Sequence, residues 1–360
     1  MPLLGWDHVE LWVGNAKQAA YFYEHGFGFT RTAYAGPETG VRDRASYVLE
    51  QGDIRFVLTS PLREDHEISR HQCRHGDGVK DISLAVPDAA EAYRQAVQRG
   101  ARGVAEPRWL EDEHGRLQVS AIGIYGDTIH SFVNRAEYHG PFAPGYVSVS
   151  ENGRAAPGIG LTNIDHVVGN VELGRMDEWV GFYERVMGFR EMIHFSDEDI
   201  STEYSALMSK VMFGGEGKIK FPLNEPAEGR RKSQIEEYLD FYGGPGVQHV
   251  ALATTNIVET VEALKERGIV FLDTPEAYYE DVGDRVGEID ESYDDLRRLL
   301  ILADRDDDGY LLQIFTKTAQ DRPTLFFEVI ERHGARGFGD GNFKALFEAI
   351  EREQALRGNL

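Results

Sequence analysis

Three side chains able to bind a metal, His166, His249 and Glu328, lie in strand-like apolar runs in the second half of this 360-residue chain. Glu328 is the only carboxylate in the run 324–330, and burying an unpaired carboxylate is costly unless it is paired or ligated. Two imidazoles and one carboxylate, with further coordination positions open, form the facial triad of non-haem Fe(II) oxygenases. We therefore predict one metal centre built from these three residues, with Fe(II) as its metal.

Each of the three residues also has a simpler interpretation. A single histidine such as His166 or His249 is more often a core or surface residue than a ligand, and Glu328 could pair with Arg332. Zinc accepts the same donor set. The chain lacks the HExxH helix of zinc proteases, and its candidate ligands lie on strands, so iron is favoured.

An internal repeat favours the interpretation that the two histidines bind a metal. Residues 5–9 (GWDHV) recur as 163–167 (NIDHV), and residues 79–85 are echoed by 247–253. Both candidate histidines therefore occupy matched positions of a duplicated scaffold. The first copy keeps His8 but has Asp81 where the second has His249, and its closing run 128–135 carries no glutamate. We predict a first half without metal, in which His8 is structural.

The repeat also predicts the fold class. Each half reads as two units of a strand, a helix and two or three further strands, so the chain is expected to be α+β with four βαβββ-like units in two pairs. Residues 139–160 are rich in Gly, Pro, Ser and Ala, which suits a connection between domains. We place an N-terminal structural and oligomerisation domain at 1–150 and a C-terminal catalytic domain at 155–360.

Composition excludes several classes of protein. There are 38 Lys and Arg against 61 Asp and Glu, a formal net charge of −23, which argues against nucleic acid or an anionic membrane surface as partner. Cys73 is the only cysteine, so no intrachain disulfide can form. The N-terminus does not resemble a signal peptide, and no apolar run is long enough to span a bilayer. We expect a cytoplasmic protein.

One apparent metal motif is better explained as a turn. Residues 304–309 (DRDDDG) fit the opening of an EF-hand calcium loop, but the twelfth position, which should be Glu, is Phe315. The segment separates two strand-like runs, 299–302 and 310–315. We therefore predict a solvated hairpin turn.

The second half resembles the 4-hydroxyphenylpyruvate dioxygenase family, whose members have the vicinal-oxygen-chelate, or glyoxalase-like, fold. No single motif is specific, but the set occurs in order through nearly the whole half. The first half is matched more loosely, through its repeat. The motifs are residues 164–166 (IDH), 221–226 (FPLNEP), 231–235 (RKSQI), 246–249 (GVQH), 312–317 (LQIFTK), 326–328 (FFE) and 337–343 (GFGDGNF).

This resemblance implies a fold, an activity and a set of site residues. Each domain should form an open barrel. The Fe(II) enzyme should take an aromatic 2-oxo acid and O2 and release homogentisate and CO2, through oxidative decarboxylation, ring hydroxylation and side-chain migration. Phe338 and Phe343 should sandwich the substrate ring. The implied substrate-lining residues are Ser205, Asn224, Gln234, Gln248, Gln313, Phe315, Phe326, Phe338 and Phe343.

The C-terminal segment has the pattern of an amphipathic helix. Phe343, Leu346, Phe347 and Ile350 repeat at helical spacing, and the glycine-rich run 337–341 precedes them. A packed terminal helix is the default interpretation. The same helix could serve as a lid that keeps water from a reactive centre. We take Gly339, Asn342 and Leu346 as the candidate lid residues.

Three other functions remain open on the sequence. A 4-hydroxymandelate synthase would share the fold, metal and substrate but hydroxylate the benzylic carbon. An extradiol ring-cleaving dioxygenase can share the ligand types, and a non-catalytic binding protein could use the scaffold alone. From the resemblance we also expect a homo-oligomer, a dimer or a tetramer.

Overall fold

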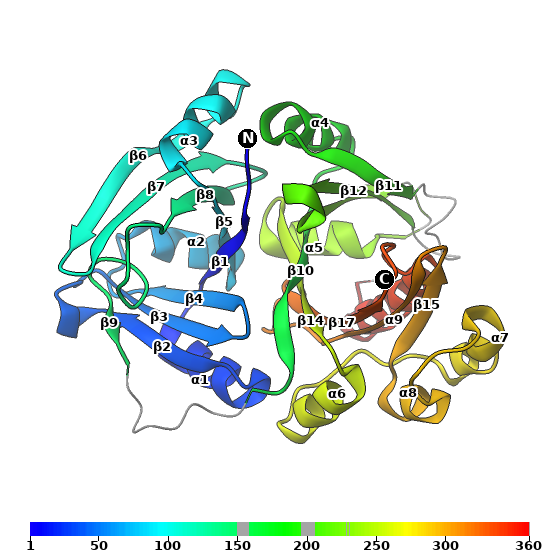
Figure 1. The fold of residues 1–360 in the computed structure, drawn as a ribbon. Coiled ribbons are helices and arrows are strands. Elements are labelled where there is room, and N and C mark those ends of the chain that lie inside the picture. Colours follow the sequence, from blue (N-terminus) through cyan, green and yellow to red (C-terminus); the bar gives the residue numbers. More distant parts are fainter. Residues whose placement is uncertain (150–157, 196–205, 228, 230, 360) are drawn as a thin grey trace.

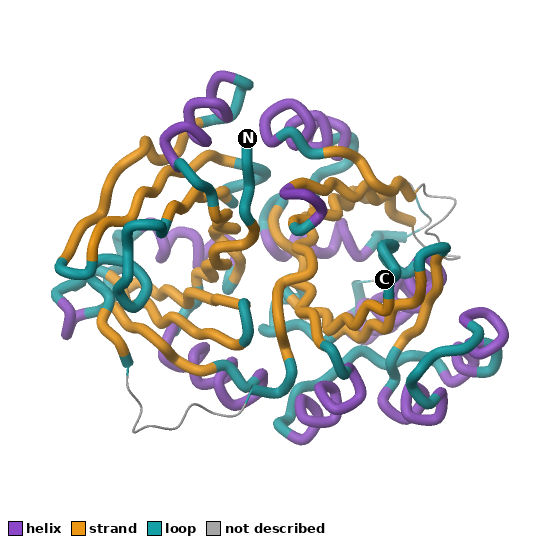
Figure 2. The backbone as a smooth tube through the Cα atoms, in the orientation of Figure 1, coloured by secondary structure: helices purple, strands orange, loops and turns teal. Residues whose placement is uncertain are grey.

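The computed structural model describes residues 1–149, 158–195, 206–227, 229 and 231–359. These residues form two curved sheets, one in each half of the chain, with most helices around the outside (Figures 1 and 2). The predicted boundary at 150–155 lies outside the described residues. None of the described helices is long and apolar enough to cross a bilayer.

The first half contains a nine-stranded sheet in the order β6-β7-β8-β5-β1-β4-β3-β2-β9. A short 3-10 turn at Pro37–Thr39 interrupts the chain between the second and third strands. The elements are β1 (Gly5–Trp12), α1 (Ala16–Phe27), β2 (Thr30–Ala35), β3 (Arg44–Gln51), β4 (Ile54–Pro61), α2 (Glu67–His75), β5 (Gly78–Ala85), α3 (Ala89–Gln98), β6 (Gly103–Asp112), β7 (Gly115–Gly123), β8 (Ile129–Asn134) and β9 (Val147–Ser148).

The second half contains an eight-stranded sheet in the order β11-β12-β13-β10-β14-β17-β16-β15. Helix α4 continues into a π-helical turn at Tyr183–Met187. The elements are β10 (Leu161–Asn170), α4 (Met176–Phe182), β11 (Arg190–Phe195), β12 (Ala206–Gly214), β13 (Ile219–Ala227), α5 (Gln234–Tyr242), β14 (Gly246–Thr254), α6 (Ile257–Glu266), α7 (Val282–Val286), α8 (Tyr293–Leu299), β15 (Leu302–Asp306), β16 (Gly309–Phe315), β17 (Phe326–His333) and α9 (Asp340–Arg357).

The predicted α+β fold of four βαβββ units is confirmed. In each unit the first strand pairs in parallel with the last, as β1 does with β4 and β14 with β17. The two units of a half join through antiparallel pairing of their first strands, β1 with β5 and β10 with β14. This joint places the opening strands of both units side by side, which is where the repeat positions its histidines.

Local sequence explains where the helices begin and end. Asn15 and Asn256 accept hydrogen bonds from backbone N–H groups in the first turns of α1 and α6, and Ser233 with Glu236 forms a capping box on α5. Helices α1 and α5 end at glycines with left-handed backbone, Gly28 and Gly243. These caps define where the three helices begin or end.

The two halves share one hydrophobic core. The rings of Tyr23, Phe27 and Phe56 in the first half pack against Phe327 on β17, with ring centroids 5.6, 5.2 and 5.9 Å apart. All four side chains are buried. Phe327 is the neighbour of Glu328 on the same strand, and adjacent strand residues face opposite sides of a sheet. The first half therefore supports the outer face of the strand that carries Glu328.

A buried histidine also connects the halves. His130 on β8 is fully buried. Its Nδ1 lies 2.8 Å from the carbonyl oxygen of Ile82, and its Nε2 lies 3.0 Å from the hydroxyl of Tyr183 in the second half. Burial lowers the pKa of His130 from 6.5 to about 4, although the bond to Ile82 opposes this. The neutral imidazole is thus the form that fits the interface.

We expect acidification to weaken the fold through His130. Between pH 6.5 and 4 the unfolded chain binds a proton that the folded chain does not, so stability falls as pH falls through this window. From pH 7 to pH 5 the loss from this residue should be about 2 kcal/mol. Urea unfolding of wild type and His130→Gln at both pH values measures it. Equal losses in the two proteins would contradict the assignment.

Candidate metal centre

The register of the second sheet brings the three predicted ligands together. His166 on β10 lies opposite Ala251 on β14, and Ala251 lies opposite Glu328 on β17. His249 is two residues from Ala251 on the same strand, so it faces the same side of the sheet. Residues that are far apart in the sequence therefore lie together as one cluster on three neighbouring strands.

The donor atoms converge closely enough for one ion. Glu328 Oε2 lies 3.1 Å from His166 Nε2 and 3.3 Å from His249 Nε2, and the three ligand atoms lie within 4.8 Å of one another. Donors that bind one ion at about 2.1 Å and at right angles are separated by about 3 Å. All three residues are buried. The predicted donor set therefore fits a metal.

The second nitrogen of each histidine is held by an acceptor. His166 Nδ1 lies 2.7 Å from Asp165 Oδ1, and His249 Nδ1 lies 3.0 Å from Gln248 Oε1. A carboxylate or amide oxygen accepts a hydrogen bond from Nδ1–H, so the lone pair of each neutral imidazole is on Nε2, the nitrogen that faces Glu328. Both histidines are thereby oriented as metal ligands.

Asp165 is itself held by two cations. The guanidinium of Arg332 donates to both carboxylate oxygens at 2.8 and 2.9 Å, and Lys220 Nζ lies 3.0 Å from Oδ2. Arg332 therefore pairs with Asp165, whereas the sequence had left open a pairing with Glu328. A two-point arginine fork fixes the carboxylate plane and so the ring of His166.

The charges of the centre follow from these contacts. Burial alone would raise the pKa of the Glu328 carboxyl, but the imidazoles of His166 and His249 outweigh it and lower the pKa to about 2. Burial likewise opposes ionisation of Asp165, yet His166 and Arg332 hold its pKa well below the ordinary value. Burial lowers the pKa of His249. Both carboxylates are thus negative at neutral pH, as a divalent cation requires.

A chain of amide hydrogen bonds connects Glu328 to the C-terminal helix. Gln313 Nε2 donates to Glu328 Oε1 at 2.9 Å, and Asn342 Nδ2 donates to Gln313 Oε1 at 2.9 Å. The hydroxyl of Tyr278 donates in turn to Asn342 Oδ1 at 2.5 Å. The glutamate oxygen that does not face the imidazoles is thereby satisfied, and α9 is joined to the centre.

A small cavity adjoins the three candidate ligands. Its wall combines aromatic and aliphatic side chains with four neutral polar ones, and its lining carries no acidic or basic side chain besides Glu328 and the two histidines. Such a wall can orient a small aromatic acid by hydrogen bonds without competing for the metal. Besides the ligands it is lined by Val168, Ser209, Pro222, Asn224, Gln313, Phe315, Phe338, Asn342 and Leu346.

The predicted lid lies over this cavity. Asn342 and Leu346 of α9 line it directly. The hairpin between β15 and β16 anchors the loop before α9, because Asp306 Oδ2 accepts from the backbone N–H of Gly337 and Asp304 Oδ2 from that of Gly341. The antiparallel pairing of β15 with β16 confirms the expected hairpin turn, and two of its carboxylates accept hydrogen bonds from the backbone.

Gly339 has a specific steric role in this loop. Its φ is +81°, a conformation that favours glycine. An added Cβ would lie 2.2 Å from Gln313 Oε1. A larger residue at position 339 would displace the Gln313 amide, which binds Glu328. The loop before α9 therefore packs directly against Gln313.

The substrate-lining residues expected from the family resemblance divide into three groups. Asn224, Gln313, Phe315 and Phe338 line the cavity beside the metal ligands. Gln234, Gln248 and Phe326 instead line a neighbouring cavity, and Phe326 stacks on His249 with centroids 4.8 Å apart. Ser205 and the side chain of Phe343 lie outside the described residues. Their assignment as substrate-lining stays a prediction.

Sequence reasoning missed three wall residues, Val168, Ser209 and Pro222. Val168 is two positions from His166 on one strand, so the alternation rule could have found it. Ser209 had no signal, because its role depends on β12 pairing with β13, which places it opposite Asn224. Its buried hydroxyl has no hydrogen-bond partner among the described residues, so it is free to bind a ligand.

The first half repeats the supporting contacts without the metal donors. Asp7 lies 2.6 Å from His8 Nδ1, and Arg135 donates to both Asp7 oxygens at 2.6 and 2.8 Å. At the positions of His249 and Glu328 the strand register places Asp81 and Ser131, which hydrogen-bond each other. No metal-type cluster forms around His8 among the described residues. The aspartate–histidine–arginine set therefore belongs to the scaffold.

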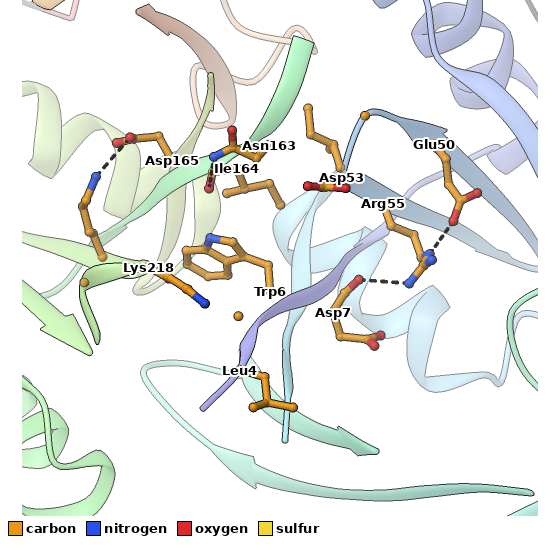
Figure 3. Close-up of a pocket in the computed structure, with 15 residues that line it drawn as sticks. Leu4, Trp6, Asp7, Glu50, Asp53, Arg55, Asn163, Ile164, Asp165 and Lys218 are labelled. Carbon is orange, nitrogen blue, oxygen red and sulfur yellow. Dashed lines mark hydrogen bonds and ion pairs between the residues drawn. The ribbon is translucent and has the colours of Figure 1, made fainter. Parts of the chain in front are cut away.

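A larger cleft lies on the other side of Asp165, between β1 and β10 (Figure 3). Trp6, Asp7 and Arg55 reach it from the first half, and Asn163 and Lys218 from the second. Arg55 is already paired with Glu50 at 2.6 Å, and Lys220 with Asp165. The cleft has no buried set of metal donors among the described residues, so its size does not make it the reaction site.

Comparison with known proteins identifies the family. Residues 1–144 match the hydroxyphenylpyruvate dioxygenase N-terminal family, and residues 163–314 match the glyoxalase/bleomycin resistance protein/dioxygenase superfamily. The chain is 48% identical to 4-hydroxyphenylpyruvate dioxygenase of Yarrowia lipolytica, over 99% of this chain and 93% of the relative. The protein of that name from Dictyostelium discoideum is also 48% identical, over 99% and 100%. The chain belongs to the 4-hydroxyphenylpyruvate dioxygenase family.

Solved structures of other proteins superpose on this chain. A mutant of 4-hydroxymandelate synthase from Streptomyces coelicolor superposes with a TM-score of 0.88 at 35% identity, over 98% of this chain and 100% of that one. The Mn(II)-bound glyoxalase from Novosphingobium aromaticivorans superposes with a TM-score of 0.51 at 13% identity, over 92% and 82%. The second similarity shows the fold alone, and it confirms the expected vicinal-oxygen-chelate architecture.

Proposed function

We propose that this protein is an Fe(II)-dependent dioxygenase that converts 4-hydroxyphenylpyruvate and O2 to homogentisate and CO2, with His166, His249 and Glu328 as the iron ligands. One observation carries the proposal: the three donor atoms converge within 4.8 Å beside a cavity whose remaining wall residues are uncharged. Relatives of the proposed name are 48% identical over nearly the whole chain. Other divalent metals fit the same donors, so iron is the finer part of the proposal.

Bound at this centre, Fe(II) would supply the electrons that O2 requires and a chelation point for the 2-oxo acid. The wall then determines which atom reacts. The uncharged groups of Ser209, Asn224 and Gln313 can hydrogen-bond the phenol and keto acid. Phe338, whose ring lies 5.0 Å from that of His166, provides an aromatic face for the substrate ring next to the ligands.

The balance of atoms defines the product. 4-Hydroxyphenylpyruvate carries a carboxylate, a keto oxygen and a phenol, and its carboxylate carbon leaves as CO2. Both atoms of O2 then remain in homogentisate, one in the new carboxylate and one in the new ring hydroxyl. No external reductant is required. The chain's own contribution is to bind, orient and keep water out, which α9 does by covering the cavity.

A 4-hydroxymandelate synthase is the second candidate, because a structure of that enzyme superposes over the whole chain. It would use the same substrate and oxygen but hydroxylate the benzylic carbon. Its lower identity, 35% against 48%, favours the first candidate.

Product identification separates the two candidates. The protein is loaded anaerobically with Fe(II), mixed with 4-hydroxyphenylpyruvate and exposed to O2, and the products are resolved by chromatography. We expect one homogentisate and one CO2 for each O2 consumed. Hydroxymandelate as the main product would establish the second candidate, and no consumption of O2 would reject both.

The amide chain to the lid makes a separate prediction. Asn342→Ala removes the bond to Gln313 and loosens α9 over the cavity, and a net hydrogen bond of about 1–1.5 kcal/mol corresponds to about a 10-fold loss in kcat/KM. We also expect O2 consumption to exceed homogentisate formation, because water then reaches the centre. Arg352→Ala is the control, because Arg352 lies on the exposed side of α9 and bonds the backbone of Asp273. This variant should still form one homogentisate for each O2 consumed. If Asn342→Ala also keeps this one-to-one ratio, α9 does not act as a lid.

The partners we propose are the aromatic 2-oxo acid and O2. Assembly into a dimer or tetramer and a cytoplasmic location stay predictions from the sequence. Analytical ultracentrifugation of the purified protein tests the first of them.

A further inference from the structure

A second cluster of metal-binding side chains lies away from the catalytic cavity, between the two halves. His71 and His75 are four residues apart on α2, so they share one face of the helix. Asp127 approaches them from the loop between β7 and β8. One ligand atom from each residue lies within 4.8 Å of the others.

The spacing of the donor atoms matches that of the catalytic centre. Asp127 Oδ2 lies 3.0 Å from His71 Nδ1 and 3.4 Å from His75 Nε2, against 3.1 and 3.3 Å around Glu328. Two imidazoles and one carboxylate at this spacing suit a zinc-type ion, with water in the fourth position. Ligand type and geometry are thus both present.

The position of the proton on the His75 ring indicates that a cation lies between His75 and Asp127. His75 Nδ1 bonds the backbone carbonyl of Tyr242, and a carbonyl can only accept. His75 Nε2 therefore presents a lone pair to the Asp127 carboxylate in the neutral imidazole. Two acceptors facing each other are repulsive unless a proton or metal ion lies between them.

Burial and unpaired atoms support the same conclusion. His71 and His75 are each 3% exposed. His71 Nε2 and Asp127 Oδ1 are buried and have no hydrogen-bond partner among the described residues. The Asp127 side chain is 36% exposed, which leaves a path for an ion and its water. Lys80 bonds the Asp127 backbone oxygen, and its Nζ lies 3.9 Å from Oδ2 at the edge of the cluster.

Contacts with the second half hold the cluster in place. Arg74, beside His75 on α2, donates to the carbonyl of Gly243 at 2.8 and 3.1 Å. Gly126, beside Asp127, has φ +60°, and an added Cβ would lie 2.4 Å from the carbonyl oxygen of Pro245. Residues 242–245, at the end of α5, therefore contact both the helix that carries the two histidines and the loop that carries Asp127. The other end of α5 carries Gln234, which lines the cavity behind His249.

We propose that His71, His75 and Asp127 bind a divalent transition-metal ion of the zinc type, separate from the catalytic metal. The ion holds α2 and the β7–β8 loop against the C-terminal end of α5. It therefore fastens the first half, which lacks the catalytic ligands, to the catalytic half. The proposal is independent of the reaction that the protein catalyses.

Cobalt binding tests the proposal in protein that lacks the catalytic ligands. The double variant His166→Ala/His249→Ala is titrated with Co²⁺, following visible absorption and bound metal after dialysis. We expect one equivalent per chain and a higher Tm with Co²⁺ than without. Adding His75→Ala should remove both effects. Adding His25→Ala, which changes an exposed histidine on α1, should leave them unchanged.

Two results would overturn the proposal: no Co²⁺ bound by the folded double variant, or one equivalent that survives His75→Ala. If circular dichroism shows that the double variant is unfolded, Co²⁺ binding is compared between wild type and Asp127→Asn instead. Wild type should bind two equivalents of Co²⁺ per chain, and Asp127→Asn should bind one. One equivalent in both proteins would exclude the second site.

Discussion

Glu328→Gln should abolish turnover while the protein stays folded. The substitution keeps the shape of the side chain but removes the carboxylate that both imidazoles face, at 3.1 and 3.3 Å. Metal catalysis contributes several kcal/mol of barrier lowering, so we expect kcat to fall by at least about 10³-fold. Fe(II) bound after anaerobic loading and gel filtration should fall in parallel.

The stability of the metal-free protein distinguishes this loss from misfolding. Glu328 is a fully buried charge that pairs with His166 and His249, and this pairing lowers the pKa of its carboxyl to about 2. A neutral isostere loses this pairing, so metal-free Glu328→Gln should have a lower Tm than metal-free wild type but keep its native circular dichroism spectrum. Ser131→Ala, at the equivalent position in the first half, is the matched control and should keep iron and activity. Normal iron content in Glu328→Gln would refute the ligand assignment.

Asp165→Asn should weaken both the metal and the fold. Its carboxylate accepts from His166 and pairs with Arg332 and Lys220. Neutralising it leaves a buried guanidinium without its partner, at a cost of about 3–5 kcal/mol in the free energy of unfolding. It also loosens His166, and loss of such a supporting contact costs about 10–100-fold in metal affinity. Urea unfolding and competition with a chromophoric Fe(II) chelator measure the two effects.

The repeat provides a matched control for this experiment. Asp7 makes the same contacts with His8 and Arg135 in the first half, where no cluster of metal donors surrounds His8 among the described residues. Asp7→Asn should therefore destabilise the fold to a similar degree and leave Fe(II) affinity within about twofold of wild type, because no ligand depends on it. Equal losses of affinity in the two variants would mean that general destabilisation, and not orientation of His166, explains the result.

Most of the fold could be predicted because the chain is duplicated. The matched DHV segments revealed four units in two pairs, and the mismatch between Asp81 and His249 indicated which half binds the metal. Glu328 followed from one physical fact, that an isolated carboxylate in an apolar strand needs a partner. These inferences require only repetition and burial, which sequence displays directly.

The rest of the site depended on pairing between distant strands. Arg332 could have bonded Glu328 or Asp165, and only the placement of β17 beside β14 and β10 decides for Asp165. Ser209 enters the cavity because β12 pairs with β13, and no local pattern marks it. Gln234 and Gln248 belong to family motifs, yet both line the neighbouring cavity. For Gln248 the reason is that side chains alternate along β14, which turns it away from the side that His249 faces.

The same duplication suggests how the protein divides its tasks. The first half retains the aspartate–histidine–arginine support but not the metal donors, and its aromatic side chains pack behind Phe327. The interface histidines of α2 bind the end of α5. Under the proposed function, the first half would supply stability and orientation, and the second half would supply the ligands of the catalytic metal.

Anomalous diffraction from a crystal grown anaerobically with Fe(II), recorded on both sides of the iron absorption edge, shows where the iron binds. We expect an iron peak bonded to His166 Nε2, His249 Nε2 and Glu328 Oε2, at one side of the cavity that Phe338 and Gln313 line. An iron-loaded, active crystal with no peak between these three atoms would refute the ligand assignment.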